Sequence, residues 1–180
     1  MNLSTHRLRI HPVTDLADIS VLASVFNTNP DFIEASEQIN GKRAYTREDI
    51  EMYVWQESAR ENSHCLAIRL GDTEEVVGTA ALLVPNPDDG RPWLGLLVIG
   101  QPWQRLGLAR EAVTVIERWL GAEGWAEVRL NVMTSNHGAL QFWKRCGYSP
   151  VERSRDLGGR HVHIMAKRLP HGHAEVRQGA

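Results

Sequence analysis

The chain of 180 residues has a formal net charge of -2 and a hydrophobic fraction of 42%, values that are ordinary for a globular protein and that exclude disordered and fibrous classes. This length suits one domain with a substantial core, and the scattered Lys and Arg residues form no basic stripe, so we expect no nucleic acid partner. The two cysteines, Cys65 and Cys146, lie far apart, which disfavours a disulfide framework and predicts a reducing, cytoplasmic location.

The opening segment MNLSTHRLRI has no apolar signal region, and the longest apolar runs fall far short of the about 20 residues that a membrane helix needs. We therefore expect neither export nor a membrane partner. Residues 7–11 alternate basic and apolar side chains, with Leu8 and Ile10 on one face. This period of two predicts a first strand, which Pro12 ends.

Two helices are predicted next. Residues 15–26 begin with an aspartate suited to cap a helix and place apolar side chains at helical spacing. Thr46, with Asp49 three residues later, predicts the start of a second helix that ends near residue 60. The intervening residues 29–43 have no clear period, so we expect a loop or broken helix that lines a substrate site.

The middle of the chain predicts three strands. Residues 64–70 and 75–84 have strand character and would be joined by a Gly71-Asp72 turn. Residues 85–92 would form a solvent loop. Residues 93–99 are almost continuously apolar, which is typical of a central strand covered on both faces.

The rest of the chain predicts two helices and three strands, over residues 107–121, 126–133, 138–145, 148–153 and 160–166. The last two strands would form a hairpin around Gly158-Gly159. The whole order predicts a single-domain α/β fold, a mixed central sheet of about seven strands with flanking helices. Residues 170–180 lack an apolar pattern, so we expect the domain to span residues 1–169 and the tail to be disordered.

The segment Gln104–Arg110 has the composition of a polyphosphate-binding turn. Such a turn offers backbone N–H groups and the positive end of a helix dipole to an anion. Gly107 lets a phosphate approach the backbone, the small Ala109 lets the helix start pack closely, and Arg105 and Arg110 add charge at the rim. Taken alone, the segment fits equally well an ordinary strand-to-helix turn in which Gly107 only relieves crowding.

The surroundings of this turn favour the phosphate interpretation. An apolar strand precedes it, and Gly100 stands where a bulge would splay that strand from its neighbour. With these features the chain resembles the GNAT superfamily of acyl-CoA N-acyltransferases over residues 3–169. The match to the nucleotide motif and to the later Asn-Ala-Gly-aromatic element of that superfamily consists of Gln104, Gly107, Ala109, Asn136, Ala139, Gly147 and Tyr148.

Residues 5–12 are also similar to the first strand of the branch that includes ribosomal-protein N-terminal acetyltransferases. The resemblance implies a splayed central strand pair and an acetyl-CoA-dependent transfer of an acetyl group to a primary amine by direct attack, without metal. The amine would belong to a small molecule or a protein N-terminus. The residues implied to bind the cofactor are Leu97, Val98, Ile99, Gln104, Arg105, Leu106, Gly107, Leu108, Ala109, Arg110 and Asn136.

Within that implied site, the edge of residues 97–99 would pair with pantetheine, and the Ile99 N–H would face the thioester carbonyl. Asn136 would hydrogen-bond the pantetheine arm. The proton-transfer groups are unassigned, because Trp143 stands where many members carry a tyrosine acid and Trp93 where some carry a glutamate base. Tryptophan has no proton of suitable acidity.

Proton transfer would then run through water or through an acid of the loop, where Glu34 and Glu37 are candidates. Such carboxylates are more typical of a solvated surface. His161, which by resemblance borders the acceptor site, is a further weak candidate. His161 and His163 share a strand face, but no third residue has a spacing that supports a metal site.

Two other functions stay open. The tryptophans at the usual catalytic positions are consistent with a non-catalytic acyl-CoA-binding module or sensor. A different nucleotide-phosphate enzyme ranks last, because the chain lacks the Lys-Ser/Thr ending of a P-loop and the three-glycine dinucleotide fingerprint. The predicted terminal hairpin of residues 148–166 would present an edge suited to a homodimer.

Overall fold

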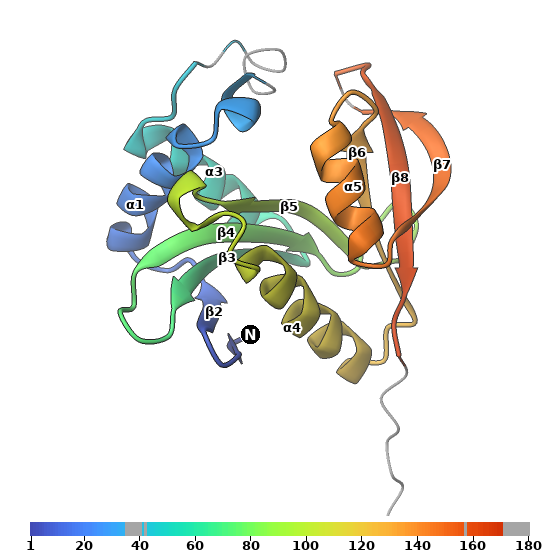
Figure 1. Ribbon diagram of the computed structural model, residues 1–180, viewed down its shortest axis with the longest axis horizontal. Coiled ribbons are helices and arrows are strands. Elements are labelled where there is room, and N and C mark those ends of the chain that lie inside the picture. Colours follow the sequence, from blue (N-terminus) through green and yellow to red (C-terminus); the bar gives the residue numbers. More distant parts are fainter. Residues whose placement is uncertain (35–40, 42, 157, 171–180) are drawn as a thin grey trace, which may run out of the picture.

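One mixed sheet of eight strands runs through the molecule, in the order β1-β2-β3-β4-β5-β6-β8-β7 (Figure 1). The computed structural model describes residues 1–34, 41, 43–156 and 158–170. The predicted α/β fold with a mixed central sheet is confirmed. The strands are β1 (Leu3–Ser4), β2 (Leu8–Pro12), β3 (Ser63–Leu70), β4 (Val76–Leu83), β5 (Trp93–Ile99), β6 (Glu127–Met133), β7 (Ser149–Arg155) and β8 (His161–Arg168).

The eighth strand is the short edge strand β1, which pairs with β2 through Leu3 and Ser4. Two residues are too few to produce a period in the sequence, so the prediction of about seven strands omitted it. β3 and β4 are joined by residues 71–75 rather than by a two-residue turn, and Glu74 takes the left-handed conformation there with φ 59°. The turn of the last hairpin contains Gly158 and Gly159, as predicted.

Helices cover both faces of the sheet. The helices that lie wholly within the described residues are α1 (Leu16–Asn27), α3 (Arg47–Ala59), α4 (Leu108–Ala122) and α5 (His137–Arg145), with a short 3-10 turn η1 (Gln101–Trp103). The predicted caps are confirmed. The Asp15 side chain accepts a hydrogen bond from the Asp18 N–H, and Thr46 and Asp49 form a reciprocal capping box.

The core has two parts, one on each face of the sheet. On one face, α4 and α5 pack on strand residues such as Leu8, Leu66 and Leu130. On the other face, α1 and α3 enclose a smaller cluster that includes Leu22 and Ile50. Each cluster is built from side chains that alternate along the strands, so burial on both faces explains the apolar character of the central strands.

The two central parallel strands, β5 and β6, separate almost at once. Their only paired positions are Trp93 and Arg129, and in Figure 1 β6, β8 and β7 stand apart from β2–β5 at the upper end of the molecule. The predicted splayed strand pair is therefore present. The opening leaves one edge of β5 without a strand partner.

The bulge in β5 lies at Gly95, and the prediction of a bulge at Gly100 was wrong. Leu94 pairs with Leu82 and Leu96 pairs with Ala81, which leaves Gly95 as the extra residue. Gly100 has another role, because a Cβ atom there would lie 2.9 Å from the Trp103 ring. Its small size lets the chain turn tightly into η1.

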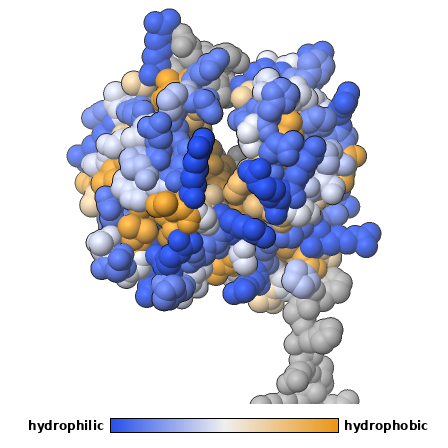
Figure 2. Space-filling model, viewed as in Figure 1, coloured by the Kyte–Doolittle hydropathy of each residue, from blue (hydrophilic) through white to orange (hydrophobic). Residues whose placement is uncertain are grey.

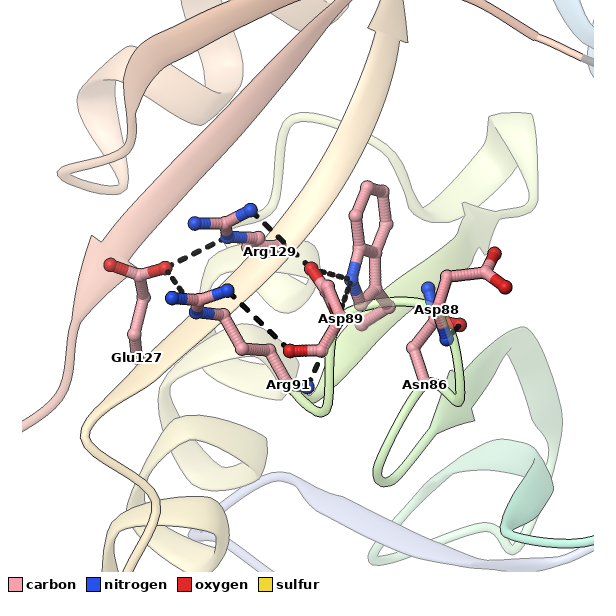
Figure 3. A network of polar contacts seen from close by, with 7 residues as sticks. Asn86, Asp88, Asp89, Arg91, Glu127 and Arg129 are labelled. Carbon is pink, nitrogen blue, oxygen red and sulfur yellow. Dashed lines mark hydrogen bonds and ion pairs between the residues drawn. The ribbon is translucent and has the colours of Figure 1, made fainter.

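The closed end of the split is held by a polar network (Figure 3). The Asp89 carboxylate accepts hydrogen bonds from the Trp93 indole N–H at 3.0 Å and from the Arg91 backbone N–H at 3.0 Å, and it pairs with Arg129 at 3.3 Å. Arg129 and Arg91 also pair with Glu127, at 2.8 Å and 3.4 Å. Residues 85–92 were predicted to be a solvent loop, and the structure shows that they tie β5 to β6.

No helix in the described residues is long and apolar enough to cross a membrane. The predicted disordered tail begins at residue 170, and all but its first residue lies outside the described part of the chain.

Candidate active site

Two adjoining cavities occupy the open end of the split, and Figure 2 shows the molecule hollowed between the two parts of the sheet. The first, which we call the split cavity, has a volume of about 520 Å³ and lies between β5 and β6. The second, the turn cavity, has a volume of about 590 Å³ and lies between the segment Trp103–Arg110 and α5. The residues that line both are Asp31, Leu97, Ile99, Gln104, Asn136, Ala139 and Trp143.

The turn cavity is bordered by a backbone segment rich in unused donors. Arg105 and Gly107 both adopt left-handed conformations, with φ 61° and 82°, and α4 starts directly afterwards at Leu108. Within the described chain, no backbone N–H from residue 105 to residue 110 donates a recorded hydrogen bond. Free N–H groups at the positive end of a helix form an anion-binding site.

A non-glycine residue in the left-handed region is uncommon, so Arg105 shows that the tight turn is maintained against a local conformational cost. The side chains of Arg105 and Arg110 are exposed and line the turn cavity, together with Arg145 of α5. The cavity is therefore positively charged at its rim. This charge distribution favours a ligand that carries phosphate.

The Gln104 side chain braces the turn from within. Its amide nitrogen donates to the Ile99 carbonyl at 2.9 Å and to the Asn29 side-chain oxygen. Asn29 is buried, and its own amide nitrogen donates to the Val25 carbonyl at 2.7 Å. Gln104 thus links three separate parts of the chain, namely the end of β5, the start of the turn and the segment after α1.

A second brace involves the N-terminal segment. Arg7 pairs with Glu111 of α4 at 2.6 Å and donates to the Leu106 carbonyl at 3.0 Å. Partial burial raises the pKa of Glu111, but hydrogen bonds from Thr5 and Arg7 outweigh it and the net pKa is lowered. The ionised carboxylate in the first turn of α4 also complements the helix dipole. The role of Thr5 and Arg7 was not predicted, because their partner is about a hundred positions away.

The unpaired edge of β5 forms one wall of the split cavity. Leu97, Val98 and Ile99 all line it, while the opposite edge of the strand is hydrogen-bonded to β4. Successive N–H groups of a strand point to opposite sides. Because the Gly100 N–H donates to Val77 of β4 at 2.8 Å, the preceding Ile99 N–H points into the split.

Asn136 lies where the two cavities join. Its side-chain oxygen caps α5 by accepting a hydrogen bond from the Ala139 N–H at 2.9 Å. For its side-chain amide nitrogen, no hydrogen bond is recorded within the described residues. That nitrogen is therefore a donor available to a ligand, since Asn136 lines both cavities.

The two tryptophans at the predicted proton-transfer positions lie in different surroundings. Trp143 is 8% exposed, lines both cavities and packs edge-on against Phe142 and Tyr148. The Trp93 indole instead bonds to Asp89 and lines a third cavity on the other side of the split. Neither side chain provides an acid or a base.

The two predicted proton-transfer candidates that the structure describes, Glu34 and His161, do not reach the split. Glu34 is exposed and lines none of the described cavities, and Glu37 lies outside the described residues. His161 is also exposed and lines none of them, and its carbonyl accepts a bond from the Thr134 N–H at 3.0 Å. Two carboxylates of the described residues do line the split cavity, Asp156 and Asp31, and Asp31 lies one turn before Glu34.

The third cavity, of about 650 Å³, opens from the split toward the last hairpin. It shares Asn131, Asp156, Arg160 and Val162 with the split cavity. Asp156 accepts a hydrogen bond from the Arg160 guanidinium, which is the main cause of its lowered pKa. The backbone N–H groups of Arg160 and Gly158 also donate to Asp156, both at 3.0 Å, and contribute to the lowering. Among the residues that the structure describes, no group of three or more His, Cys, Asp or Glu residues could hold a metal ion.

Comparison with known proteins agrees with this geometry. The model of the acetyltransferase (GNAT) family matches residues 30–148. A crystal structure of an acetyltransferase from Thermus thermophilus superposes with a TM-score of 0.71 at 25% identity, covering 94% of this chain and 100% of that one. A search of curated proteins gave no match.

Two further solved structures show the fold at lower identity. The spermidine N-acetyltransferase from Vibrio cholerae in complex with CoA and spermine has a TM-score of 0.70 at 13% identity, with 92% of this chain and 97% of that chain covered. The ribosomal-protein-S5-alanine acetyltransferase from Vibrio fischeri has a TM-score of 0.70 at 12% identity, with 94% and 97% covered. The predicted ribosomal-protein branch is thus one of several structural neighbours.

Proposed function

The chain belongs to the acetyltransferase (GNAT) family, and on that premise we propose that it transfers an acetyl group from acetyl-CoA to the primary amine of a small molecule or a protein N-terminus. The observation that carries the proposal is the unpaired edge of β5 beside the donor-rich turn. These two features supply a place for the pantetheine arm and a place for the pyrophosphate of one ligand.

The cofactor would be bound mainly by backbone groups. The N–H groups from Arg105 to Arg110 would hold the pyrophosphate, including those of Leu106, Gly107, Leu108 and Ala109. The edge at Leu97, Val98 and Ile99 would pair with pantetheine as an added strand does. Gln104 contributes by bracing the turn, since its amide nitrogen is already bonded within the protein.

The reaction would take place where the two cavities join. The Ile99 N–H, which points into the split, would donate to the thioester carbonyl as negative charge develops there, a contact that is typically worth about 3 kcal/mol in the transition state. The amine would approach through the third cavity, beside Asp156 and Arg160. It attacks the carbonyl carbon directly, and the thiol of CoA leaves.

The proposal covers primary amines as a class. The neighbouring structures include a spermidine N-acetyltransferase and a ribosomal-protein alanine acetyltransferase, whose names describe a polyamine and a protein acceptor. At such low identity, these two structures support the fold of this chain and not the identity of its acceptor. The cytoplasmic location, the homodimer and the domain boundary at residue 169 likewise stay predictions from the sequence.

A second candidate function is an acyl-CoA-binding sensor without turnover. It is favoured by Trp143, which fills the wall shared by the two cavities with a side chain that cannot donate a proton in catalysis. A sensor would use the same turn and the same strand edge. The two functions therefore differ in turnover and share cofactor binding.

The test combines isothermal titration of acetyl-CoA with an assay of CoA thiol release over a panel of amines, including polyamines, free amino acids, aminoglycosides and peptide N-termini. We expect binding, together with thiol release for at least one class of amine. Binding without release across the panel would favour the sensor. Absence of binding would contradict both functions.

A further inference from the structure

The wall shared by the split cavity and the turn cavity contains one ionisable side chain. Of the described residues that line both cavities, only Asp31 is titratable. If the proposed function is correct, the thioester lies at this junction, since the cofactor arm enters from one cavity and the amine from the other. Asp31 would then border the reacting atoms.

The segment that carries Asp31 is fixed relative to the end of β5. Thr28, at the end of α1, accepts a hydrogen bond from the Gln101 N–H at 3.0 Å. The buried Asn29 accepts a hydrogen bond from the Gln104 side chain, which also holds the Ile99 carbonyl at 2.9 Å. A helical turn follows, in which the Ile33 N–H donates to the Asn29 carbonyl at 3.0 Å. Asp31 is thus positioned by the same glutamine that braces the cofactor turn.

The other charged groups of the two cavities are unsuited to accept a proton. Asp156 is the only other carboxylate that lines the split cavity in the described chain, and its oxygens already accept bonds from Gly158 and Arg160. The remaining charged side chains are the cations Arg160 in the split cavity and Arg105, Arg110 and Arg145 in the turn cavity. For the Asp31 carboxylate, no hydrogen bond or ion pair is recorded among the described residues, which leaves both oxygens available.

We propose that Asp31 is the general base of the acetyl transfer, a role that rests on the proposed function. The amine nitrogen forms a bond to the acetyl carbonyl carbon, and the C–S bond breaks. The proton of the amine passes to the Asp31 carboxylate, directly or through one water molecule. The departing thiolate takes a proton from solvent. A positioned base of this kind typically contributes about 100-fold or more to the rate.

The test compares Asp31→Asn with Asp31→Ala, Glu34→Gln and Glu61→Gln, using an amine that the wild-type protein acetylates. We expect Asp31→Asn to lower kcat about 100-fold, while acetyl-CoA affinity by titration calorimetry stays unchanged. Glu61→Gln removes an exposed carboxylate that lies after α3 and away from the cavities, so its kcat should match the wild type. Formate should restore part of the rate to Asp31→Ala, because a small carboxylate can occupy the vacated position.

Several results would overturn the role of Asp31. A kcat of Asp31→Asn within about threefold of the wild type would do so, as would a larger loss in Glu34→Gln. A raised KM with unchanged kcat would mean that Asp31 only attracts the acceptor ammonium group. Wild-type protein that binds acetyl-CoA and releases no thiol with any amine would instead contradict the proposed function, and this inference with it.

Discussion

Asn136 combines a helix cap with a proposed contact to the ligand. Its oxygen caps α5, and its amide nitrogen faces the junction of the two cavities. A cap alone would explain the presence of asparagine at this position, since Asn, Asp and Ser serve almost equally well there. A test of the binding role therefore needs a substitution that removes the amide nitrogen and keeps the capping oxygen.

Asn136→Asp provides that separation. Aspartate keeps the capping oxygen but has no N–H to donate, so we expect acetyl-CoA affinity to fall while stability is maintained. Asn136→Ala should weaken acetyl-CoA binding and also remove the cap, with a decrease of about 1 kcal/mol in the free energy of unfolding. Denaturant titration and calorimetry of the two variants measure the two effects. If Asn136→Asp binds acetyl-CoA as tightly as the wild type, the side chain of Asn136 serves only to cap α5.

Arg105 tests the electrostatics of the turn. Arg105→Glu replaces a cation at the rim of the turn cavity by an anion, so we expect acetyl-CoA binding to weaken about tenfold or more. Arg118→Glu makes the same change of charge on an exposed residue near the other end of α4, and should leave binding almost unchanged. Titration calorimetry at constant ionic strength compares them. Similar losses in both variants would indicate a general charge effect instead of a local contact.

At this scale the sequence predicted which residues border the cavities better than it predicted the contacts of each side chain. Gln104, Gly107 and Asn136 all border the turn cavity. The bond of Gln104 to Asn29 joins positions 75 residues apart, and nothing local encodes it. Glu34 and Asp31 lie one turn apart in a segment without a period, so only the tertiary contacts of Asn29 distinguish them.

At the scale of elements, the caps, turns and helices follow from local chemistry. The Asp15 and Thr46 caps, the start of α4 after Gly107 and the helix in the segment 137–145 all agree with their predicted positions to within about two residues. The attachment of α1 to the sheet is different in kind. It depends on a buried charge, and burial of a charge lowers the stability of the folded protein unless a charged partner is present.

That charge belongs to Asp18, which is fully buried and pairs with Arg69 of β3. Burial raises the pKa of Asp18, and the charge of Arg69 opposes the increase. Arg69→Met would leave the carboxylate buried without its main partner, and we expect a loss of about 3 kcal/mol in the free energy of unfolding at neutral pH. Arg9→Met, which changes the exposed cross-strand neighbour of Arg69, should have little effect.

The pH dependence of the Arg69→Met variant follows from the direction of the shift. A carboxyl group with a higher pKa in the folded than in the unfolded protein binds protons more readily when folded, so protonation favours folding. Removal of Arg69 would raise the pKa of Asp18 further. The stability difference between Arg69→Met and the wild type should therefore shrink as the pH falls through that pKa. Urea titrations across the acidic range measure it, and a constant difference would contradict the account.

The whole molecule consists of two parts of one sheet, joined at the closed end of the split. β1–β5 form one part and β6–β8 the other, and a single pair of positions connects them in the ladder. The Asp89 network strengthens that connection by tying the loop before β5 to Arg129 and Glu127 of β6. The order of helices and strands predicted the mixed sheet. The network was not predicted, because residues 85–92 have the composition of a solvent loop.

Asp89→Ala would remove the acceptor shared by Trp93, Arg91 and Arg129, and we expect the free energy of unfolding to fall by about 2 kcal/mol, because partly buried donors lose their partner. The adjacent Asp88 is the matched control. It is exposed, and no bond of its carboxylate is recorded in the described residues, so Asp88→Ala should be nearly neutral. Thermal and denaturant unfolding compare the two. Equal losses would show that the network adds little to stability.

Gly95 is the extra residue of the bulge in β5, so the residues that face the α4 core have even numbers before it and odd numbers after it. On the Trp93 side of the bulge the even-numbered Leu94 faces the α4 core, whereas beyond it the odd-numbered Leu97 and Ile99 face that core and Leu96 and Val98 face the other. The two faces of the sheet therefore exchange between odd and even residue numbers within one strand. This exchange contributes to an apolar run without alternation. Deletion of Gly95 would restore an unbroken ladder in which Leu94 and Leu96 keep their partners Leu82 and Ala81, and every side chain beyond stays on its present face. A ladder that kept Gly95 without the bulge would instead slip by one residue, exchange the two faces beyond it and turn the Ile99 N–H away from the split. The bulge therefore determines which backbone amides point into the split.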